Sequence, residues 1–271
     1  MFNLDEQTAR DARLFINQPV IALAVIKTSD AWVFQEPDPK SPRLTQMLYG
    51  ENVTIHGQKD VFYWVQSQSD LYCGWIHGAA LRQVPQFETK THCTRFTAPI
   101  TKEADLKSSL IGFLPPAATF NISETQGDYV KLAEWGWIHR AHAFELSEPL
   151  DLLTVAREQL GRSYLWGGRG TSGVDCSGLV QMIYRFSGRL IPRDSDLQHK
   201  YMAQNHQSVN AKEMSAGDLI FIPNHVMLYS GNKNVIHASG HHMRVVEEPL
   251  MSALAHSDIA KERLIIKAYH W

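Results

Sequence analysis

One cysteine, Cys176, occupies a position that favours chemistry. A glycine-rich loop, residues 166–173, precedes it, and an amphipathic run follows in which Leu179, Val180 and Ile183 recur at helical spacing. We therefore expect Cys176 in the first turn of a helix, where unpaired N–H groups and the helix dipole favour an anion. A thiol in this position has a lowered pKa and is partly thiolate near neutral pH. The alternative interpretation is a buried structural cysteine.

A cysteine nucleophile needs a base that accepts its proton, and two downstream histidines can supply one. His225 opens one predicted strand, and His237 lies in the next strand, across the turn at residues 230–234. If the numbers of two residues paired across the hairpin add to an even sum, the two imidazoles share one face of the sheet and are close enough to meet. We assign Cys176 as nucleophile, His225 as base and His237 as the residue that orients the base. Because the chain holds 13 histidines, the alternative is that one or both are ordinary surface residues.

We expect neither a metal ion nor a cofactor. Cys176, His225 and His237 are metal ligands by type, but no fourth ligand is evident. The glycine-rich loop lacks the Gly-Lys-Ser/Thr ending of a phosphate-binding loop and does not follow a predicted strand. Its glycines are better explained as positions where the backbone approaches a substrate closely.

These residues lie in a C-terminal segment, 148–271, with an α+β pattern. A helical face begins near Asp151, the cysteine helix follows, and a loop then leads to a run of strands. Helices followed by an antiparallel meander are typical of that class. The predicted strands cover residues 218–222, 225–229, 234–238 and 263–268. The stretches 203–213 and 241–261 carry no decisive signal.

Two β-rich segments precede this one, and each ends in Gly-Trp-Ile-His-x-Ala. The two copies begin 62 positions apart (136 minus 74). A repeat of about 60 β-rich residues indicates two small barrels rather than a solenoid. His77 and His139 recur at the same place in the repeat, which shared structure explains better than metal binding does. We divide the chain into an N-terminal segment, two β-barrels and the α+β domain, at residues 1–18, 19–84, 85–147 and 148–271.

Composition excludes several functions. The 271 residues fit two or three domains, and 44% of them are hydrophobic, which suffices for a core. A formal charge of −2, without a cluster of Lys and Arg, argues against a nucleic-acid partner. The three cysteines are odd in number and lack metal-type spacing, which favours a reducing compartment. With no signal-peptide pattern and no apolar run of membrane length, we expect a cytoplasmic protein without a membrane partner; the oligomeric state stays open.

The C-terminal segment resembles the NlpC/P60 family of cell-wall cysteine peptidases in six motifs that occur in the family's order. They are Tyr164-Leu165-Trp166-Gly167-Gly168, Asp175-Cys176-Ser177-Gly178, Pro192-Arg193-Asp194-Ser195, Gly217-Asp218-Leu219, His225-Val226-Met227-Leu228-Tyr229 and Val235-Ile236-His237-Ala238-Ser239. The resemblance implies a papain-like α+β fold with a Cys-His-His triad at Cys176, His225 and His237. The β-rich segments resemble bacterial SH3 domains in their Gly-Trp-Ile ending. The three-part layout is similar to that of the γ-D-glutamyl-L-diamino acid endopeptidases that recycle murein peptides.

This resemblance implies hydrolysis of the bond between D-iso-glutamate and the diamino acid of a murein-derived peptide. The thiolate of Cys176 attacks the carbonyl, and the backbone N–H of the same residue is the expected oxyanion donor. His225 protonates the leaving amine and then activates water. Whether the diamino acid is diaminopimelate or lysine stays open.

The resemblance also implies a substrate with a free N-terminal L-Ala, whose ammonium needs a carboxylate partner. One candidate is Asp175, which alternatively caps the cysteine helix. The other is Glu51, for which an exposed position is the alternative. Further residues expected to bind substrate are Ser177, Tyr72, Trp166, Arg193 and Ser195.

Two other functions stay open. A murein amidase or acyl transferase could use the same triad, because a thioester intermediate can pass to other nucleophiles. A wall-binding protein with an inert C-terminal half is the second alternative, although the intact Cys176, His225 and His237 argue against it.

Overall fold

The structure, a computed structural model, describes all residues except 1–3, 134, 211, 257–266 and 271. The chain forms two compact units. The C-terminal unit comprises Leu150–Gly168 and Ser172–Trp271 together with Met1–Asp11, and the N-terminal unit comprises Ala12–Pro149 together with Arg169–Thr171. Three residues of the glycine-rich loop thus group with the N-terminal unit. None of the described helices has both the length and the apolar character of a membrane span.

The C-terminal unit is built on a six-stranded antiparallel sheet in the order β16-β21-β17-β18-β19-β20. Its strands are β16 (Ser208–Val209), β17 (Leu219–Ile222), β18 (His225–Gly231), β19 (Asn234–Ser239), β20 (Arg244–Pro249) and β21 (Lys267–Tyr269). The three strands predicted between residues 218 and 238 are confirmed. Of the strand predicted at 263–268, residues 263–266 lie outside the described residues. β20 occupies a stretch without a decisive sequence signal.

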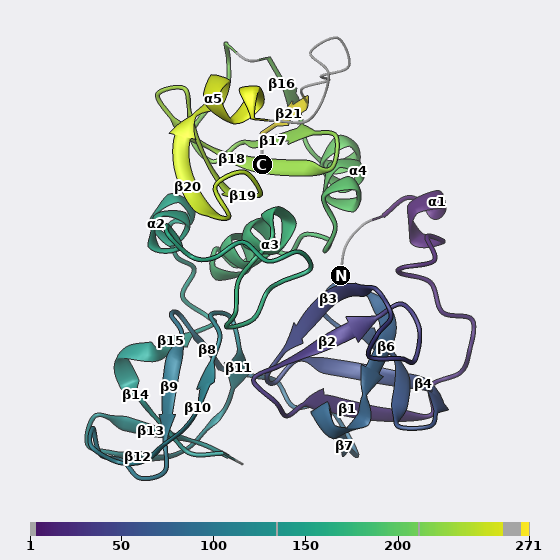
Figure 1. Ribbon diagram of the computed structural model, residues 1–271, viewed down its shortest axis with the longest axis vertical. Helices are drawn as coiled ribbons and strands as arrows, with labels where there is room; N and C mark the ends of the chain where they lie inside the picture. The colour runs from purple at the N-terminus through teal and green to yellow at the C-terminus, as the bar shows by residue number, and fades with distance from the viewer. Residues whose placement is uncertain (1–3, 134, 211, 257–266, 271) are drawn as a thin grey trace. The chain divides into compact units, whose positions relative to one another are not determined.

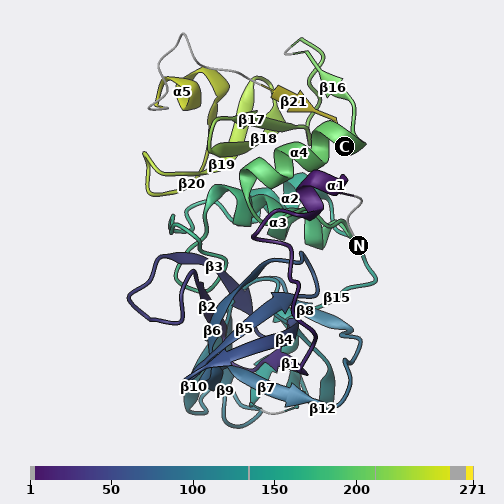
Figure 2. The same ribbon diagram turned by 90° about the vertical axis from the view of Figure 1, so that its right-hand side faces the viewer.

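Helices pack on this sheet and fix the position of the cysteine. The described helices are α1 (Glu6–Ala9), α2 (Leu152–Glu158), α3 (Cys176–Phe186), α4 (Ser195–Asn205) and α5 (Leu250–Ala255). The helix predicted to begin at Cys176 is therefore confirmed as α3. It packs against β18, β19 and α2, and Figures 1 and 2 both show α2 and α3 side by side below the sheet. Every residue of α3 except Arg185 is buried, so the helix has little freedom to move its first turn.

The N-terminal unit contains two sets of strands, each with its own apolar core. The first set forms one seven-stranded sheet in the order β3-β2-β6-β5-β4-β1-β7. Its strands are β1 (Ala22–Ile26), β2 (Asp30–Phe34), β3 (Arg43–Leu48), β4 (Asn52–Lys59), β5 (Phe62–Ser67), β6 (Cys73–His77) and β7 (Leu81–Val84). All of these strands fall within the first predicted β-segment, and alternating residues such as Val53, Ile55 and Val65 fill the core.

The second set divides into a five-stranded sheet, β10-β9-β14-β13-β12, and a three-stranded sheet, β11-β8-β15. Its strands are β8 (His92–Thr94), β9 (Ala98–Thr101), β10 (Leu110–Leu114), β11 (Thr119–Phe120), β12 (Ile122–Gln126), β13 (Tyr129–Leu132), β14 (Trp137–His139) and β15 (Ala143–Glu145). The molecule is thus a mixed α and β protein with a β-rich N-terminal part.

The repeated Gly-Trp-Ile-His motif has the same local structure in both copies. His77 and His139 each precede a short 3-10 helix. The Nδ1 atom of His77 accepts the backbone N–H of Ala79 at 3.1 Å, and that of His139 accepts the N–H of Ala141 at 3.2 Å. The prediction that shared structure explains these two histidines is therefore confirmed.

Candidate active site

Asp175 fixes the first turn of α3, where Cys176 lies. Its Oδ1 atom accepts the backbone N–H of Gly178 at 2.7 Å, and its Oδ2 atom accepts the N–H of Gly167 at 2.9 Å. One carboxylate therefore caps the helix and anchors the glycine-rich loop beside it. The helix-cap interpretation of Asp175 is confirmed.

Asp175 also belongs to a buried ion pair. Arg193 donates to Oδ1 and Oδ2 of Asp175 at 3.0 and 2.8 Å, and to Oγ of Ser177 at 2.8 Å. The Arg193 side chain is only 1% exposed, so its charge depends on this bidentate partner. The structure thus brings together three of the residues expected to bind substrate, and here they stabilise the start of the cysteine helix. Their contact with a substrate stays a prediction.

The thiol of Cys176 is neutral in the resting protein. Burial, reinforced by the charge of Asp175, raises the pKa of Cys176 to about 12, although the backbone N–H groups of Val226 and Ser177 act in the opposite direction. The lowered pKa expected from the helix start was wrong, because desolvation outweighs the helix terminus at this depth. The N–H of Val226 acts on the sulfur, so α3 brings Cys176 to the beginning of β18.

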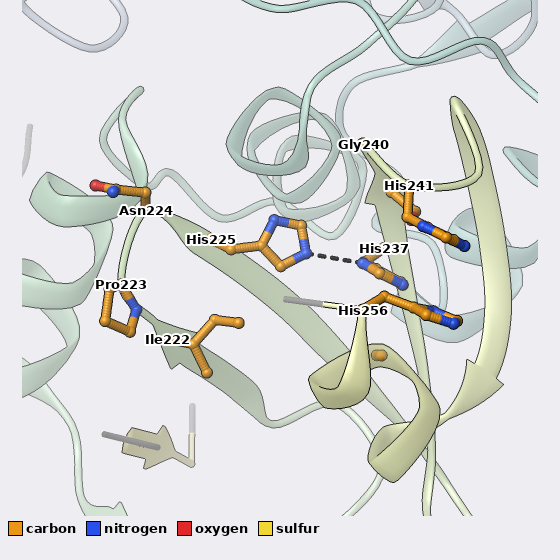
Figure 3. A pocket seen from close by; sticks show the side chains of 10 residues that line it. Ile222, Pro223, Asn224, His225, His237, Gly240, His241 and His256 are labelled. Carbon is orange, nitrogen blue, oxygen red and sulfur yellow. Dashed lines mark hydrogen bonds between the residues drawn. The ribbon is translucent and has the colours of Figure 1, made fainter. Parts of the chain in front are cut away.

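His225 and His237 form a hydrogen-bonded pair across the β18–β19 hairpin. The register pairs Leu228 with Ile236, an even sum, so the two histidines are diagonal neighbours on one face, as predicted. Nε2 of His225 lies 2.8 Å from Nδ1 of His237. Figure 3 shows the two rings pointing toward each other.

Glu248 extends this pair, and the sequence analysis missed it. Nε2 of His237 lies 3.0 Å from Oε1 of Glu248 on β20. Burial raises the pKa of Glu248, but hydrogen bonds and electrostatic interactions with His237 and His242 outweigh burial, and the net pKa is lowered. Glu248 is therefore a carboxylate at neutral pH. The register of β19 and β20, which sets Val246 opposite His237, puts Glu248 on the same face two residues further along.

This chain of contacts determines which nitrogen carries each proton. An ionised Glu248 can only accept, so Nε2 of His237 must donate to it. Neutral His237 then has an unprotonated Nδ1, which accepts the Nε2–H of His225. His225 is left with an unprotonated Nδ1, the form of imidazole that can accept a thiol proton.

Both imidazoles are neutral in the resting site. Burial lowers the pKa of His225 to about 3, and the repulsion that His237 would exert on a protonated His225 lowers it further. Burial also lowers the pKa of His237, although the hydrogen bond to Glu248 opposes the effect. A neutral base and a buried neutral thiol can exchange a proton only when a reaction removes the resulting charge.

A cavity of about 300 Å³ opens beside the histidine pair. It is lined by His225 and His237, and also by His241, Ala253 and His256. Figure 3 shows His241 and His256 beyond His237 as seen from His225.

The other residues expected to bind substrate occupy varied positions. Trp166 is 65% exposed. Ser195 begins α4 and lines a second cavity, of about 410 Å³, in the C-terminal unit. Glu51 and Tyr72 belong to the N-terminal unit, where both are buried. The exposed position considered for Glu51 was wrong, because its carboxylate accepts from Arg169 at 2.8 and 3.2 Å.

The glycines of the loop serve the chain's own packing. A Cβ atom on Gly168 would lie 2.8 Å from the carbonyl oxygens of Gly173 and Leu165, and one on Gly173 would lie 2.8 Å from the Leu165 side chain. These two glycines therefore let the chain pack closely against itself, and a close approach of the loop to a substrate stays a prediction.

Comparison with known proteins adds a family context. Residues 161–263 match the model of the NlpC/P60 family, and residues 33–81 match that of the bacterial dipeptidyl-peptidase SH3 domain. The γ-D-glutamyl-L-lysine dipeptidyl-peptidase of Bacillus cereus is 28% identical over 227 residues, which cover 72% of this chain and 66% of that protein. Dipeptidyl-peptidase 6 of Lysinibacillus sphaericus is 34% identical over 107 residues, 38% of each protein. The matches thus span less than two thirds of either relative.

A solved structure supports the fold. A crystal structure of an NlpC/P60 family protein from Bacillus cereus superposes with a TM-score of 0.75, covering 91% of this chain and 98% of that chain at 21% identity. The expected α+β fold of the NlpC/P60 type with an N-terminal SH3-like domain is therefore confirmed. In the described residues the N-terminal strands pair in open orders, so the two closed barrels stay a prediction.

Proposed function

This chain carries an NlpC/P60 domain and a bacterial SH3 domain, and on that premise we propose that it is a cysteine endopeptidase acting on murein stem peptides. The bond it hydrolyses is the one between D-iso-glutamate and the following diamino acid. The observation that carries the proposal is the hydrogen-bonded chain from His225 through His237 to Glu248, together with a buried thiol at a helix start on which the N–H of Val226, the residue next to His225, acts.

Acylation follows from the protonation states. The sulfur of Cys176 attacks the γ-carbonyl carbon of D-glutamate while its proton passes to Nδ1 of His225. The imidazolium that forms keeps its Nε2–H bond to His237, and His237 keeps its bond to the anionic Glu248. The charge developing on His225 is therefore stabilised through the chain. The backbone N–H of Cys176, which begins α3, is the proposed donor to the oxyanion.

Release of products uses the same base. His225 gives its proton to the leaving α-amine of the diamino acid as the C–N bond breaks, and a thioester on Cys176 remains. His225, again neutral, takes a proton from water, which attacks the thioester carbonyl. The thiol leaves with the proton held by His225, and the site returns to its resting state.

The requirement for a free amino end is a separate part of the proposal. It is supported by the names of the two relatives, both dipeptidyl-peptidases, which remove two residues from an amino terminus. An enzyme of this kind acts on peptides released from muramic acid, as in murein recycling. The cytoplasmic location expected from the sequence stays a prediction, as does the residue that receives the amine.

Alanine substitution of Glu51 is a poor test of amine binding. Glu51 is 3% exposed and pairs with the buried guanidinium of Arg169. Removing one partner of such a pair destabilises a protein by about 3–5 kcal/mol. A loss of activity would then reflect folding as easily as substrate recognition, so the substrate should be varied instead.

The test uses L-Ala-γ-D-Glu-diaminopimelate, its N-acetylated form and a muramyl-linked peptide, with products identified by mass spectrometry. We expect L-Ala-γ-D-Glu and free diaminopimelate from the first peptide alone, and no products with Cys176→Ala. Cleavage at another bond, or activity in the Cys176 variant, would overturn the proposal. Cleavage of all three peptides at similar kcat/KM would overturn only the amine requirement.

A further inference from the structure

Three histidines outside the triad converge at one place in the C-terminal unit. His241 and His242 follow β19, and His256 follows α5. Each offers one ring nitrogen, and these nitrogens all lie within 4.8 Å of one another. The rings of His241 and His256 are stacked, with centroids 4.0 Å apart, and His242 meets both edge-on. Two separate segments thus bring one nitrogen of each of the three imidazoles into a single group.

Glu248 completes this group with an anion. Its Oε1 lies 3.4 Å from Nε2 of His242, and its Oε2 lies 3.7 Å from Nδ1 of His256. Ligand atoms on a tetrahedral zinc ion are roughly 3.3 Å apart, given bonds of about 2.0–2.1 Å. Three imidazoles and one carboxylate are a ligand set that suits Zn²⁺ and similar transition metals.

The geometry points to a binding site for a Zn²⁺-type ion at His241, His242 and His256, with Glu248 as its carboxylate ligand. The side chains of His242 and His256 are 31% and 35% exposed, so an ion can reach them from solvent. The ring nitrogens, which lie within 4.8 Å of one another, must approach to roughly 3.3 Å, and the stacked rings of His241 and His256 must rotate out of their parallel arrangement.

The site is coupled to the proposed catalytic chain through Glu248. The Oε1 atom that accepts from His237 at 3.0 Å is the same atom that faces His242. A metal ion bound to the Glu248 carboxylate withdraws electron density from the carboxylate oxygens. It also pulls the carboxylate away from the Nε2–H of His237. His237 then no longer holds His225 in the required tautomer. Metal binding is therefore inhibitory, and this half of the inference rests on the proposed function, whereas binding itself does not.

Binding is measured first, in a protein without the reactive thiol. Cys176 and His225 could also hold zinc, so Cys176→Ala is the background for the titration. Zn²⁺ is titrated calorimetrically into this protein, into the same protein with His242→Ala or His256→Ala added, and into a control with His92→Ala. We expect one strong site, weakened at least tenfold by either cluster substitution and unchanged in the control. Equal affinity in all four proteins would overturn the site.

Inhibition is measured next, with Cys176 intact. The rate of hydrolysis of L-Ala-γ-D-Glu-diaminopimelate is measured at increasing concentrations of free Zn²⁺. The rate of each variant is divided by the rate of the same variant in EDTA. We expect the inhibitory Zn²⁺ concentration to rise at least tenfold in His242→Ala. An unchanged inhibitory concentration would show that zinc acts elsewhere, at the thiol for instance, and would overturn the coupling. If no protein hydrolyses this peptide or its lysine counterpart, the proposed function fails while the titration still decides the site.

Discussion

Two pairs of histidines in this molecule look alike in sequence and differ in structure. His77 and His139 each end a strand, accept one backbone N–H, and meet the edge of an aromatic ring 5.4 and 5.3 Å away. Both are exposed. His225 and His237 also lie on strands, but they are largely withdrawn from solvent and bond to each other.

The difference lies in what the ring nitrogens contact. In the repeated motif Nδ1 of each exposed ring accepts a backbone N–H in a local turn, so the ring is a structural cap. In the hairpin both nitrogens of His237 are engaged, one by His225 and one by Glu248. A role for histidine is thus determined by what its nitrogens contact and by burial rather than by residue type or by position at the end of a strand.

Removing the proposed base should have the largest effect. His225→Ala leaves the Cys176 thiol without a proton acceptor, and we expect kcat/KM to fall roughly 10³-fold or more. His77→Ala and His139→Ala are the matched controls and should retain activity within twofold, losing about 0.5–2 kcal/mol of stability as lost caps. Steady-state kinetics on the diaminopimelate tripeptide decides this. Full activity in the His225 variant would remove His225 from the mechanism.

Removing the orienting histidine should cost less. In His237→Ala the base remains, but its ring and tautomer are no longer fixed, so we expect a loss of roughly 10²-fold, mainly in kcat. His237→Asn should be impaired less than His237→Ala if its amide oxygen accepts the Nε2–H of His225. A larger loss for His237→Ala than for His225→Ala would reverse the assigned roles.

Glu248 should show a smaller effect of the same kind, because it acts through His237. Glu248→Ala should lower kcat roughly tenfold with KM little changed, and Glu248→Gln, which keeps an acceptor oxygen, should recover most of the activity. Glu247→Ala on the same strand is the control. A rise in KM without a fall in kcat would indicate that Glu248 contacts substrate instead of positioning His237.

The pH dependence of stability tests the burial of the base. An unfolded histidine has a pKa near 6.5, and burial lowers that of His225 to about 3, so the unfolded state binds the proton first as the pH falls. The stabilisation that neutral His225 contributes is fully present above about pH 6.5 and is lost progressively as the pH falls toward 3. Between pH 7 and 5 the free energy of unfolding, measured in urea, should fall by up to about 2 kcal/mol more in the unsubstituted protein than in His225→Asn. Equal losses would mean that His225 titrates normally.

Sequence patterns predicted the parts of the site that depend on local structure. Helical spacing after the glycine-rich loop located the start of α3, and alternation in the hairpin located His225 and His237 on one face. Both patterns cover only a few consecutive residues, so the local structure that they predict depends little on tertiary contacts.

The remaining features depend on contacts between distant residues. Glu248 reaches His237 only through the register of β19 and β20, and β20 had no decisive pattern. The pKa of Cys176 was predicted in the wrong direction because burial by the whole unit outweighs the helix start. The meeting of His241, His242 and His256 likewise requires α5 to fold back toward β19.

The most direct test of the account is the protonation of the two triad imidazoles. Nitrogen-15 NMR of histidine-labelled protein, assigned with His225 and His237 variants, reports which ring nitrogen carries hydrogen. From pH 6 to 8 we expect neutral rings, each protonated at Nε2 and bare at Nδ1, and loss of this uniform tautomer in Glu248→Ala. An imidazolium at His225 near neutral pH, or a hydrogen on its Nδ1, would contradict the account, because the Cys176 thiol would then have no vacant base.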